Sequence, residues 1–284
     1  MNALLNNPLV IGLIELAFKE DIGDGDHTSM ACIESSSKGR SVIVAKEEGI
    51  LAGAFLADYI FKKIDPCLLF KQIVPDGSKV TNEQVVMEIE GSSISMLTAE
   101  RTVLNFIQRL SGIATQTQMY VSTLKGLHTQ ILDTRKTTPG MRMLEKWAVE
   151  TGGGANHRIG LYDMILIKDN HIDFAGGIQP ALERTHAYLK AHKRNLKIEI
   201  ETRSLNEVEQ VLSVGGVNRI MLDNFSPELL KEAVLLINGR YETEASGGIT
   251  LQTLRTYAET GVDFISSGAL THSVKSLDFS MRAV

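Results

Sequence analysis

One stretch of the sequence, residues 133–171, concentrates cationic side chains in a chain whose formal net charge is −5. It contains six Lys or Arg residues and two His residues among apolar ones. Arg135 and Arg158 can each hold a carboxylate or a phosphate through two parallel hydrogen bonds. Lys136 and Lys168 add point charges. The stretch therefore predicts a local site for a ligand that carries several negative charges.

Two carboxylates, Glu201 and Asp223, each stand where a predicted strand ends. Such a pair suits Mg²⁺ held jointly with a phosphorylated sugar, or electrostatic support of a cationic sugar transition state. One of them could instead be a structural ion-pair partner of Lys168 or Arg135. Both interpretations place acidic groups beside the predicted cationic site.

Two glycine turns follow the last predicted strands and predict a phosphate site. They are Ser246-Gly247-Gly248 and Ser267-Gly268-Ala269. We expect a helix to open at Thr250, so that its N-terminal N–H groups and dipole would hold a phosphate. The earlier triplet Gly152-Gly153-Gly154 matches neither a dinucleotide-binding nor a P-loop pattern, and we interpret it as a backbone hinge.

For the other polar residues of the cationic stretch, the sequence allows either a functional or a structural role. His157 and His171 could donate hydrogen bonds, although a lone His more often belongs to a core. Arg142 and Lys146 lie four residues apart on a predicted helix, and we expect Lys146 on its solvated face.

The elements that must position these residues follow a regular alternation after about residue 125. Six short apolar segments, each interpreted as a strand, occupy 129–134, 163–168, 196–201, 219–223, 241–246 and 262–267. Helical patterns lie between several of them, with expected caps at Ser204, Ser226 and Thr250. This alternation predicts a β/α barrel, in which the carboxyl ends of the strands form one rim. The residues that would meet there are Asp133, Thr134, Arg135, Lys168, Glu201, Asp223, Ser246 and Ser267.

The earlier part of the chain has a different pattern. An amphipathic helix is expected over 9–20, β-like segments over 41–53 and 79–91, and a long helix over 97–124. We therefore predict an α+β domain over residues 1–112 and a β/α barrel over 113–272. The fold class is α/β.

Composition excludes several broad classes of protein. The sequence of 284 residues has no run of 18 apolar residues, and its negative charge argues against general nucleic-acid binding. Cys32 and Cys67 lack metal-ligand spacing, so we interpret them as reduced thiols. We expect a cytoplasmic protein with no membrane and no nucleic-acid partner.

Several motifs together resemble one family. D-T-R-K-T-T-P-G begins at Asp133, N-H-R ends at Arg158, K-D-N-H begins at Lys168, and M-L-D-N-F and E-A-S-G-G-I follow later. This order and spacing resembles quinolinate phosphoribosyltransferase, also called carboxylating nicotinate-nucleotide pyrophosphorylase. The resemblance covers nearly the whole chain, and A-E-R-T around Arg101 extends it upstream.

The resemblance implies transfer of phosphoribose from phosphoribosyl pyrophosphate to quinolinate with decarboxylation, which yields nicotinate mononucleotide for NAD synthesis. It implies Mg²⁺ at Glu201 and Asp223, catalytic roles for Lys136, Glu201 and Asp223, and an open-faced barrel with the tail 273–284 on the smaller domain. It also implies a homodimer, possibly a hexamer, in which Arg101 enters the neighbouring active site. The implied substrate-binding residues are Arg101, Thr134, Arg135, Lys136, His157, Arg158, Lys168, Glu201 and Asp223. The implied phosphate-binding residues are Ser246, Gly247, Gly248, Ser267, Gly268 and Ala269.

Three alternatives remain open. A relative associated with molybdenum transport shares the fold and many motifs but acts on another substrate. A Schiff-base aldolase would use Lys168 as its nucleophile. A phosphate-sugar sensor would bind the donor without turnover.

Overall fold

In the computed structural model, which describes residues 2–284, the chain divides into two compact units. Unit 1 comprises the residues up to Met119 together with Lys136–Gly153 and Leu270–Val284. Unit 2 comprises Tyr120–Arg135 and Gly154–Ala269. No helix of the described residues is both long enough and apolar enough to cross a membrane.

Unit 1 is built on an antiparallel sheet with strand order β12-β1-β5-β3. Its strands are β1 (Lys38–Ala45), β3 (Leu69–Gln72), β5 (Val85–Ser92) and β12 (Phe279–Ala283), and a separate pair joins β2 (Gly49–Ile50) to β4 (Lys79–Val80). Its helices are α1 (Asn2–Leu5), α2 (Pro8–Asp21), α3 (His27–Cys32), α4 (Ala54–Ile64), most of α5 (Ser93–Thr123), α6 (Arg142–Thr151) and most of α12 (Ala269–His272). Ser41 of β1 pairs with Ala283 of β12. Two segments that are far apart in the sequence therefore form neighbouring strands of this sheet.

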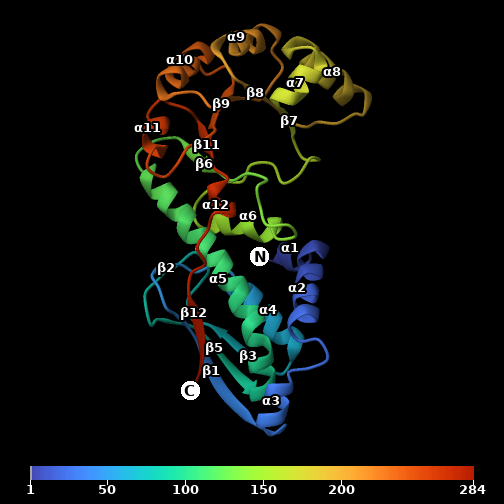
Figure 1. Cartoon of the computed structure of the whole chain (residues 1–284), viewed down its shortest axis with the longest axis vertical. Coiled ribbons are helices and arrows are strands. Elements are labelled where there is room, and N and C mark those ends of the chain that lie inside the picture. Colours follow the sequence, from blue (N-terminus) through green and yellow to red (C-terminus); the bar gives the residue numbers. More distant parts are fainter. Residues whose placement is uncertain (1) are drawn as a thin grey trace. The chain divides into compact units, whose positions relative to one another are not determined.

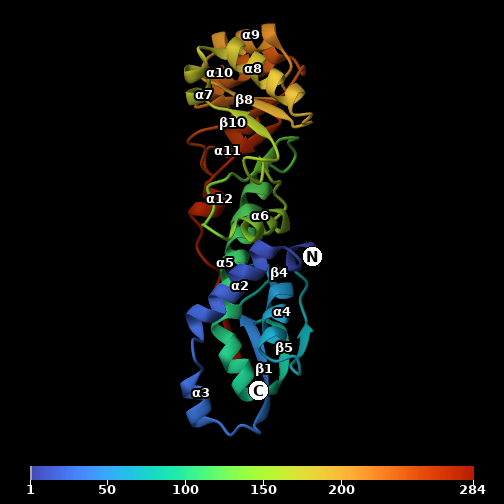
Figure 2. The same cartoon turned by 90° about the vertical axis from the view of Figure 1, so that its right-hand side faces the viewer.

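The long helix α5 forms the core of unit 1 together with this sheet. The apolar positions that predicted the helix, Val103, Leu104, Ile107, Leu110 and Ile113, are all buried. Helix α2 lies beside α5, and both views show α5 running along the sheet (Figures 1 and 2).

Unit 2 contains a parallel sheet of six strands in the order β6-β11-β10-β9-β8-β7. The strands are β6 (Gln130–Leu132), β7 (Ile165–Ile167), β8 (Ile198–Thr202), β9 (Arg219–Asp223), β10 (Glu242–Ser246) and β11 (Phe264–Ser266). Five of them lie within the segments that the sequence predicted as strands, and β8 extends one residue beyond its predicted segment, to Thr202. Since β6 and β7 are the two edges of the sheet, the predicted open-faced α/β architecture is confirmed.

Five helices connect these strands: α7 (Asp169–Ala175), α8 (Ile178–Ala191), α9 (Leu205–Val214), α10 (Pro227–Ile237) and α11 (Leu254–Ala258). Helices α8, α9 and α10 lie on one side of the sheet (Figures 1 and 2). Ser204 and Ser226 cap α9 and α10 as predicted, because each hydroxyl accepts a backbone N–H of the first turn. The predicted cap at Thr250 is wrong. Residues after Thr250 form turns, and α11 begins only at Leu254.

The bounds of the two units differ from the predicted division at 112/113 for two reasons. Helix α5 continues unbroken through that point. The segment Lys136–Gly153 packs within unit 1, where Nη2 of Arg109 lies 2.8 Å from Oε1 of the fully buried Glu145. A charged pair of this kind gives no apolar pattern that a sequence would show.

Candidate active site

The polar residues that end the strands of unit 2 do share one edge of its sheet. Asp223 and Ser246 are the last residues of β9 and β10 and pair directly in the parallel register. Glu201 stands one residue from the end of β8, and Lys168 follows β7 directly. Neighbouring parallel strands point the same way, so these side chains belong to the carboxyl edge, where sites of such folds form.

Lys168 and Glu201 form an ion pair at this edge. Nζ of Lys168 lies 3.3 Å from Oε2 of Glu201, whose side chain is 8% exposed. Burial raises the pKa of Glu201, the charge of Lys168 opposes that rise, and the charge of Asp223 adds to it. Glu201 and Asp223 are therefore close enough to influence each other, and the predicted structural pairing of Glu201 with Lys168 is also present.

Helix α7 begins immediately after Lys168. Nδ1 of His171 accepts the backbone N–H of Lys168 at 2.9 Å. This bond caps the first turn and gives His171 a structural role that its sequence position left open.

The two predicted arginine clamps lie near each other in unit 2. Arg158 is 9% exposed, and its Nη1 donates to the carbonyl of Met164 at 3.2 Å. Burial and then the neighbouring charge of Arg135 lower the pKa of Arg158. Two guanidinium groups that repel each other in a partly buried place would gain stability from an anion between them.

The first glycine turn requires glycine for conformational reasons. Gly247 and Gly248 have φ of 95° and 63°, which disfavour any residue with a Cβ. Since the short α11 begins at Leu254, the expected helix N-terminus does not follow the turn directly. A phosphate here would depend on the turn itself. In the second turn, the N–H of Ser267 already donates to the carbonyl of Leu132 at 3.0 Å.

Beneath this edge lies a buried charged cluster that sequence reasoning missed. Nε2 of His157 lies 2.8 Å from Oε2 of Glu199 and 3.4 Å from Oε2 of Glu244. Nη1 of Arg219 lies 2.9 Å from that same Glu244 oxygen. Glu199, Arg219 and Glu244 precede Glu201, Asp223 and Ser246 on their strands by an even number of residues. Because strand side chains alternate, this spacing was the signal that could have placed them on the same face.

Charge and burial compete within this cluster. Burial lowers the pKa of His157, and the neighbouring carboxylates of Glu199 and Glu244 raise it. The N–H of Arg158, which donates to Nδ1 of His157, opposes a second proton on the ring. Burial and the charge of Glu244 raise the pKa of Glu199. Burial also disfavours the ionised form of Glu244, yet His157 and Arg219 lower its pKa on balance. The cluster therefore combines two acids with two bases in the interior of unit 2.

Two residues of unit 1 complete the predicted set. Arg101 is exposed on α5. Lys136 is exposed, and its carbonyl accepts the hydroxyl of Thr271 at 2.8 Å.

The expected surface position of Lys146 is wrong, because its side chain is 1% exposed. Helix α6 buries residues on more than one of its sides, so a spacing of four from Arg142 did not mark a solvated face. Arg142 itself donates from Nε to the hydroxyl of Thr137 at 3.0 Å. At the end of this helix, a Cβ on Gly152 would lie 2.4 Å from the carbonyl oxygen of Ala114, so this glycine permits close packing against α5.

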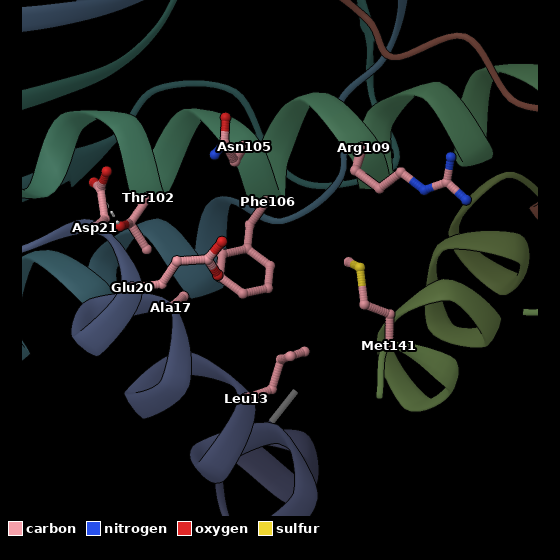
Figure 3. A pocket seen from close by; sticks show the side chains of 9 residues that line it. All are labelled: Leu13, Ala17, Glu20, Asp21, Thr102, Asn105, Phe106, Arg109 and Met141. Atoms are coloured by element: carbon pink, nitrogen blue, oxygen red, sulfur yellow. Dashed lines mark hydrogen bonds between the residues drawn. The ribbon is translucent and has the colours of Figure 1, made fainter. Parts of the chain in front are cut away.

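A hollow of about 260 Å³ lies elsewhere, between α2 and α5 of unit 1. Its lining residues are Leu13, Ala17, Glu20, Asp21, Thr102, Asn105, Phe106, Arg109 and Met141 (Figure 3). The hydroxyl of Thr102 lies 3.5 Å from Oδ2 of Asp21. Among the residues that the structure describes, the lining of this hollow includes none of the predicted site residues.

Fold and site together define a class: an α/β protein with an open parallel sheet, whose carboxyl edge carries Lys168, the acids Glu201 and Asp223, and a glycine turn. Comparison with known proteins gives the family. The model of the quinolinate phosphoribosyl transferase C-terminal domain matches residues 113–282, and that of the N-terminal domain matches residues 26–111. The chain belongs to the quinolinate phosphoribosyl transferase family.

Individual relatives agree with this assignment. The chain is 47% identical to quinolinate phosphoribosyltransferase [decarboxylating] 1b of Nicotiana tabacum, covering 95% of this chain and 81% of that protein. It is 45% identical to the probable nicotinate-nucleotide pyrophosphorylase [carboxylating] of Bacillus subtilis (strain 168), covering 95% and 91%. The crystal structure of NadC from Streptococcus pyogenes superposes with a TM-score of 0.92 at 40% identity, covering 97% of each chain.

Proposed function

We propose that this chain transfers phosphoribose from phosphoribosyl pyrophosphate to quinolinate and releases pyrophosphate and CO₂, forming nicotinate mononucleotide. Membership in the quinolinate phosphoribosyl transferase family carries the proposal. The nearby guanidinium groups of Arg135 and Arg158 supply the matching chemistry, since quinolinate carries two carboxylates on adjacent ring carbons.

The first chemical step needs no base from the protein. The pyridine nitrogen of quinolinate already has a lone pair, which forms the bond to C1′ of the sugar. The bond from C1′ to the pyrophosphate oxygen breaks, and its electrons leave with that oxygen. As positive charge develops on the sugar, the carboxylates Glu201 and Asp223 stabilise it.

Decarboxylation follows from the product of that transfer. The ring nitrogen is now positively charged and accepts electron density from C2. The bond between C2 and its carboxylate breaks, CO₂ leaves, and C2 takes up a proton. Arg135 and Arg158 orient the ring for this step, with Thr134 and Lys168 as further proposed contacts. The predicted contact of His157 with the ligand is replaced by an indirect role, because its ring nitrogens face Glu199, Glu244 and the N–H of Arg158. Lys136, next in the chain to Arg135, is a proposed catalytic and binding residue.

The donor substrate requires compensation of its phosphate charges. Glu201 and Asp223 fit Mg²⁺, because two carboxylates plus substrate phosphates are an ordinary ligand set for this ion. Mg²⁺ held by these two residues would supply positive charge that offsets the negative charge of the pyrophosphate. The proposed binding site of the sugar phosphate consists of the turns Ser246-Gly247-Gly248 and Ser267-Gly268-Ala269.

We also propose a homodimer, possibly assembled further into a hexamer, in which Arg101 serves the active site of the second copy. Its exposed position on α5 is compatible with contact to another chain. A reducing compartment, the cytoplasm, is proposed because Cys32 and Cys67 are both free and exposed.

The decisive experiment combines the purified protein with phosphoribosyl pyrophosphate, Mg²⁺ and quinolinate labelled in its C2 carboxylate. We expect equal amounts of labelled CO₂, nicotinate mononucleotide and pyrophosphate. Quinolinate without donor, and donor with nicotinate in its place, are the controls. Absence of nicotinate mononucleotide at saturating substrates would refute the proposal. Borohydride trapping of a covalent adduct on Lys168 would instead favour an aldolase.

A further inference from the structure

The imidazole of His157 is held from inside the barrel by two carboxylates on different strands. Its Nε2 lies 2.8 Å from Oε2 of Glu199 on β8 and 3.4 Å from Oε2 of Glu244 on β10. Both glutamate side chains are fully buried, and that of His157 is 6% exposed. Buried carboxylates are costly unless they are paired, so an arrangement of this kind strongly restrains the ring.

The other ring nitrogen faces the backbone. The N–H of Arg158 donates to Nδ1 of His157 at 2.7 Å, and the N–H of His157 donates to Oδ1 of the buried Asp133 at 2.9 Å. An Nδ1 that accepts a hydrogen bond leaves the ring proton on Nε2, where the carboxylates also favour it. The ring thus links the interior glutamates to the backbone that carries Arg158.

Arg219 is a second basic residue that contacts Glu244. Its Nη1 lies 2.9 Å from Oε2 of Glu244, and its guanidinium lies 3.9 Å from the centre of the Phe264 ring. His157, Glu199 and Glu244 also form a group whose ligand atoms lie close enough together to hold a metal ion. Because the Glu244 oxygen nearest His157 is also the acceptor for Arg219, a guanidinium already supplies positive charge at that point.

We propose that Glu199 and Glu244 are positioning residues for substrate binding, which act through His157 to fix the backbone that carries the Arg158 clamp. The inference rests on the proposed function. Neither glutamate touches the ligand. Their contribution is to hold the turn from Asn156 to Arg158 in one arrangement, so that the clamp is formed before the pyridine diacid arrives.

Glu199→Gln and Glu244→Gln test this proposal with little change in shape. We expect the KM for quinolinate to rise ~10-fold or more in each variant, as loss of outer supporting contacts commonly causes. The KM for phosphoribosyl pyrophosphate and the kcat at saturating quinolinate should stay near those of the unsubstituted protein. The double variant should cost little more than the worse single variant, because both act through one ring.

Glu242→Gln is the matched control. Oε2 of Glu242 lies 3.1 Å from Nη2 of Arg219, but its side chain is 43% exposed and it has no contact with His157 among the described ion pairs. It should leave both KM values unchanged. An equal fall in affinity for both substrates, or a loss of kcat alone, would overturn the positioning role in favour of a general structural one.

A spectroscopic readout separates this inference from the proposed function. With ¹⁵N-labelled histidine, and His157→Gln to assign the signal, we expect the His157 proton on Nε2, a preference that Glu199→Gln weakens. A proton on Nδ1 with a bare Nε2 would overturn the inference even if the enzyme turns over. Stoichiometric zinc or manganese bound by the unsubstituted protein and lost in Glu244→Gln would also overturn it. If no nicotinate mononucleotide forms but the Nε2 proton is found, only the proposed function fails.

Discussion

The side-chain oxygen of Asn224 occupies the place where a side chain at residue 247 would begin. A Cβ built on Gly247 would lie 2.2 Å from Oδ1 of Asn224. Asn224 has a left-handed φ of 57°, donates its N–H to the carbonyl of Ser246 at 2.8 Å, and donates from Nδ2 to Oδ2 of Asp223 at 2.6 Å. One asparagine therefore joins a proposed metal ligand to the proposed phosphate turn.

Gly247→Ala should damage donor binding selectively. The added methyl group must displace Asn224, and the φ of 95° is itself unfavourable for alanine. We expect kcat/KM for phosphoribosyl pyrophosphate to fall ~100-fold, about 3 kcal/mol of transition-state stabilisation, with a smaller effect on the KM for quinolinate. Gly239→Ala is the control, because φ there is 70° but nothing lies within 4 Å of the added Cβ. Similar losses in both variants would argue against the role of Asn224.

Arg135→Ala should lower kcat/KM for quinolinate by ~100-fold or more, since a guanidinium that holds a carboxylate in two places is not replaced by water. The control is Arg255→Ala, whose side chain is 51% exposed and pairs with Glu259. Steady-state rates at varied quinolinate measure both. Comparable rates for the two variants would show that Arg135 does not contact the ligand.

Lys146→Ala should destabilise the fold. Lys146 is 1% exposed, so truncation removes packing and leaves a cavity in the interior. We expect a loss of about 3 kcal/mol in the free energy of unfolding, against about 0.5 kcal/mol or less for the exposed Lys231→Ala. Denaturant unfolding followed by circular dichroism measures both. An unchanged midpoint for Lys146→Ala would contradict the burial of this lysine.

Glu83 makes the stability of unit 1 depend on acid pH. Hydrogen bonds from Arg282 on β12 and from Lys46 lower its pKa from 4.5 to about 2. Because the folded pKa lies below the unfolded one, this contribution is present above about pH 4.5 and disappears as pH falls towards 2. The difference in thermal stability between the unsubstituted protein and Glu83→Gln should therefore be greatest near neutral pH. A difference that grows on acidification would contradict the ion pair.

Arg101→Ala and Glu201→Gln should each be nearly inactive alone and should complement each other when co-expressed. In a mixed dimer, one site receives both an intact Arg101 and an intact Glu201. Random mixing leaves about a quarter of all sites functional, and activity should recover accordingly. Activity that stays at the level of the separate variants would contradict donation of Arg101 across a dimer.

The sequence determined the local elements and the chemistry of the candidate edge. Six strand segments and the caps at Ser204 and Ser226 were predictable because apolar runs and capping hydroxyls act over a few residues. Motif order around Arg135, Arg158 and Lys168 indicated the family, since these residue types at this spacing are specific. The helix cap predicted at Thr250 was wrong, because a hydroxyl before an apolar run is also compatible with the turns that precede α11.

Only the tertiary structure decided what surrounds the clamps. Glu199 and Glu244 lie 45 residues apart in the chain, and they meet at His157 because β8 and β10 flank β9 in one sheet. The burial of Lys146 was likewise hidden, because the charge of a lysine suggests solvent until the helices around it are placed. Pairing of buried charges depends on distances between segments remote in sequence, and strand order is what sets those distances.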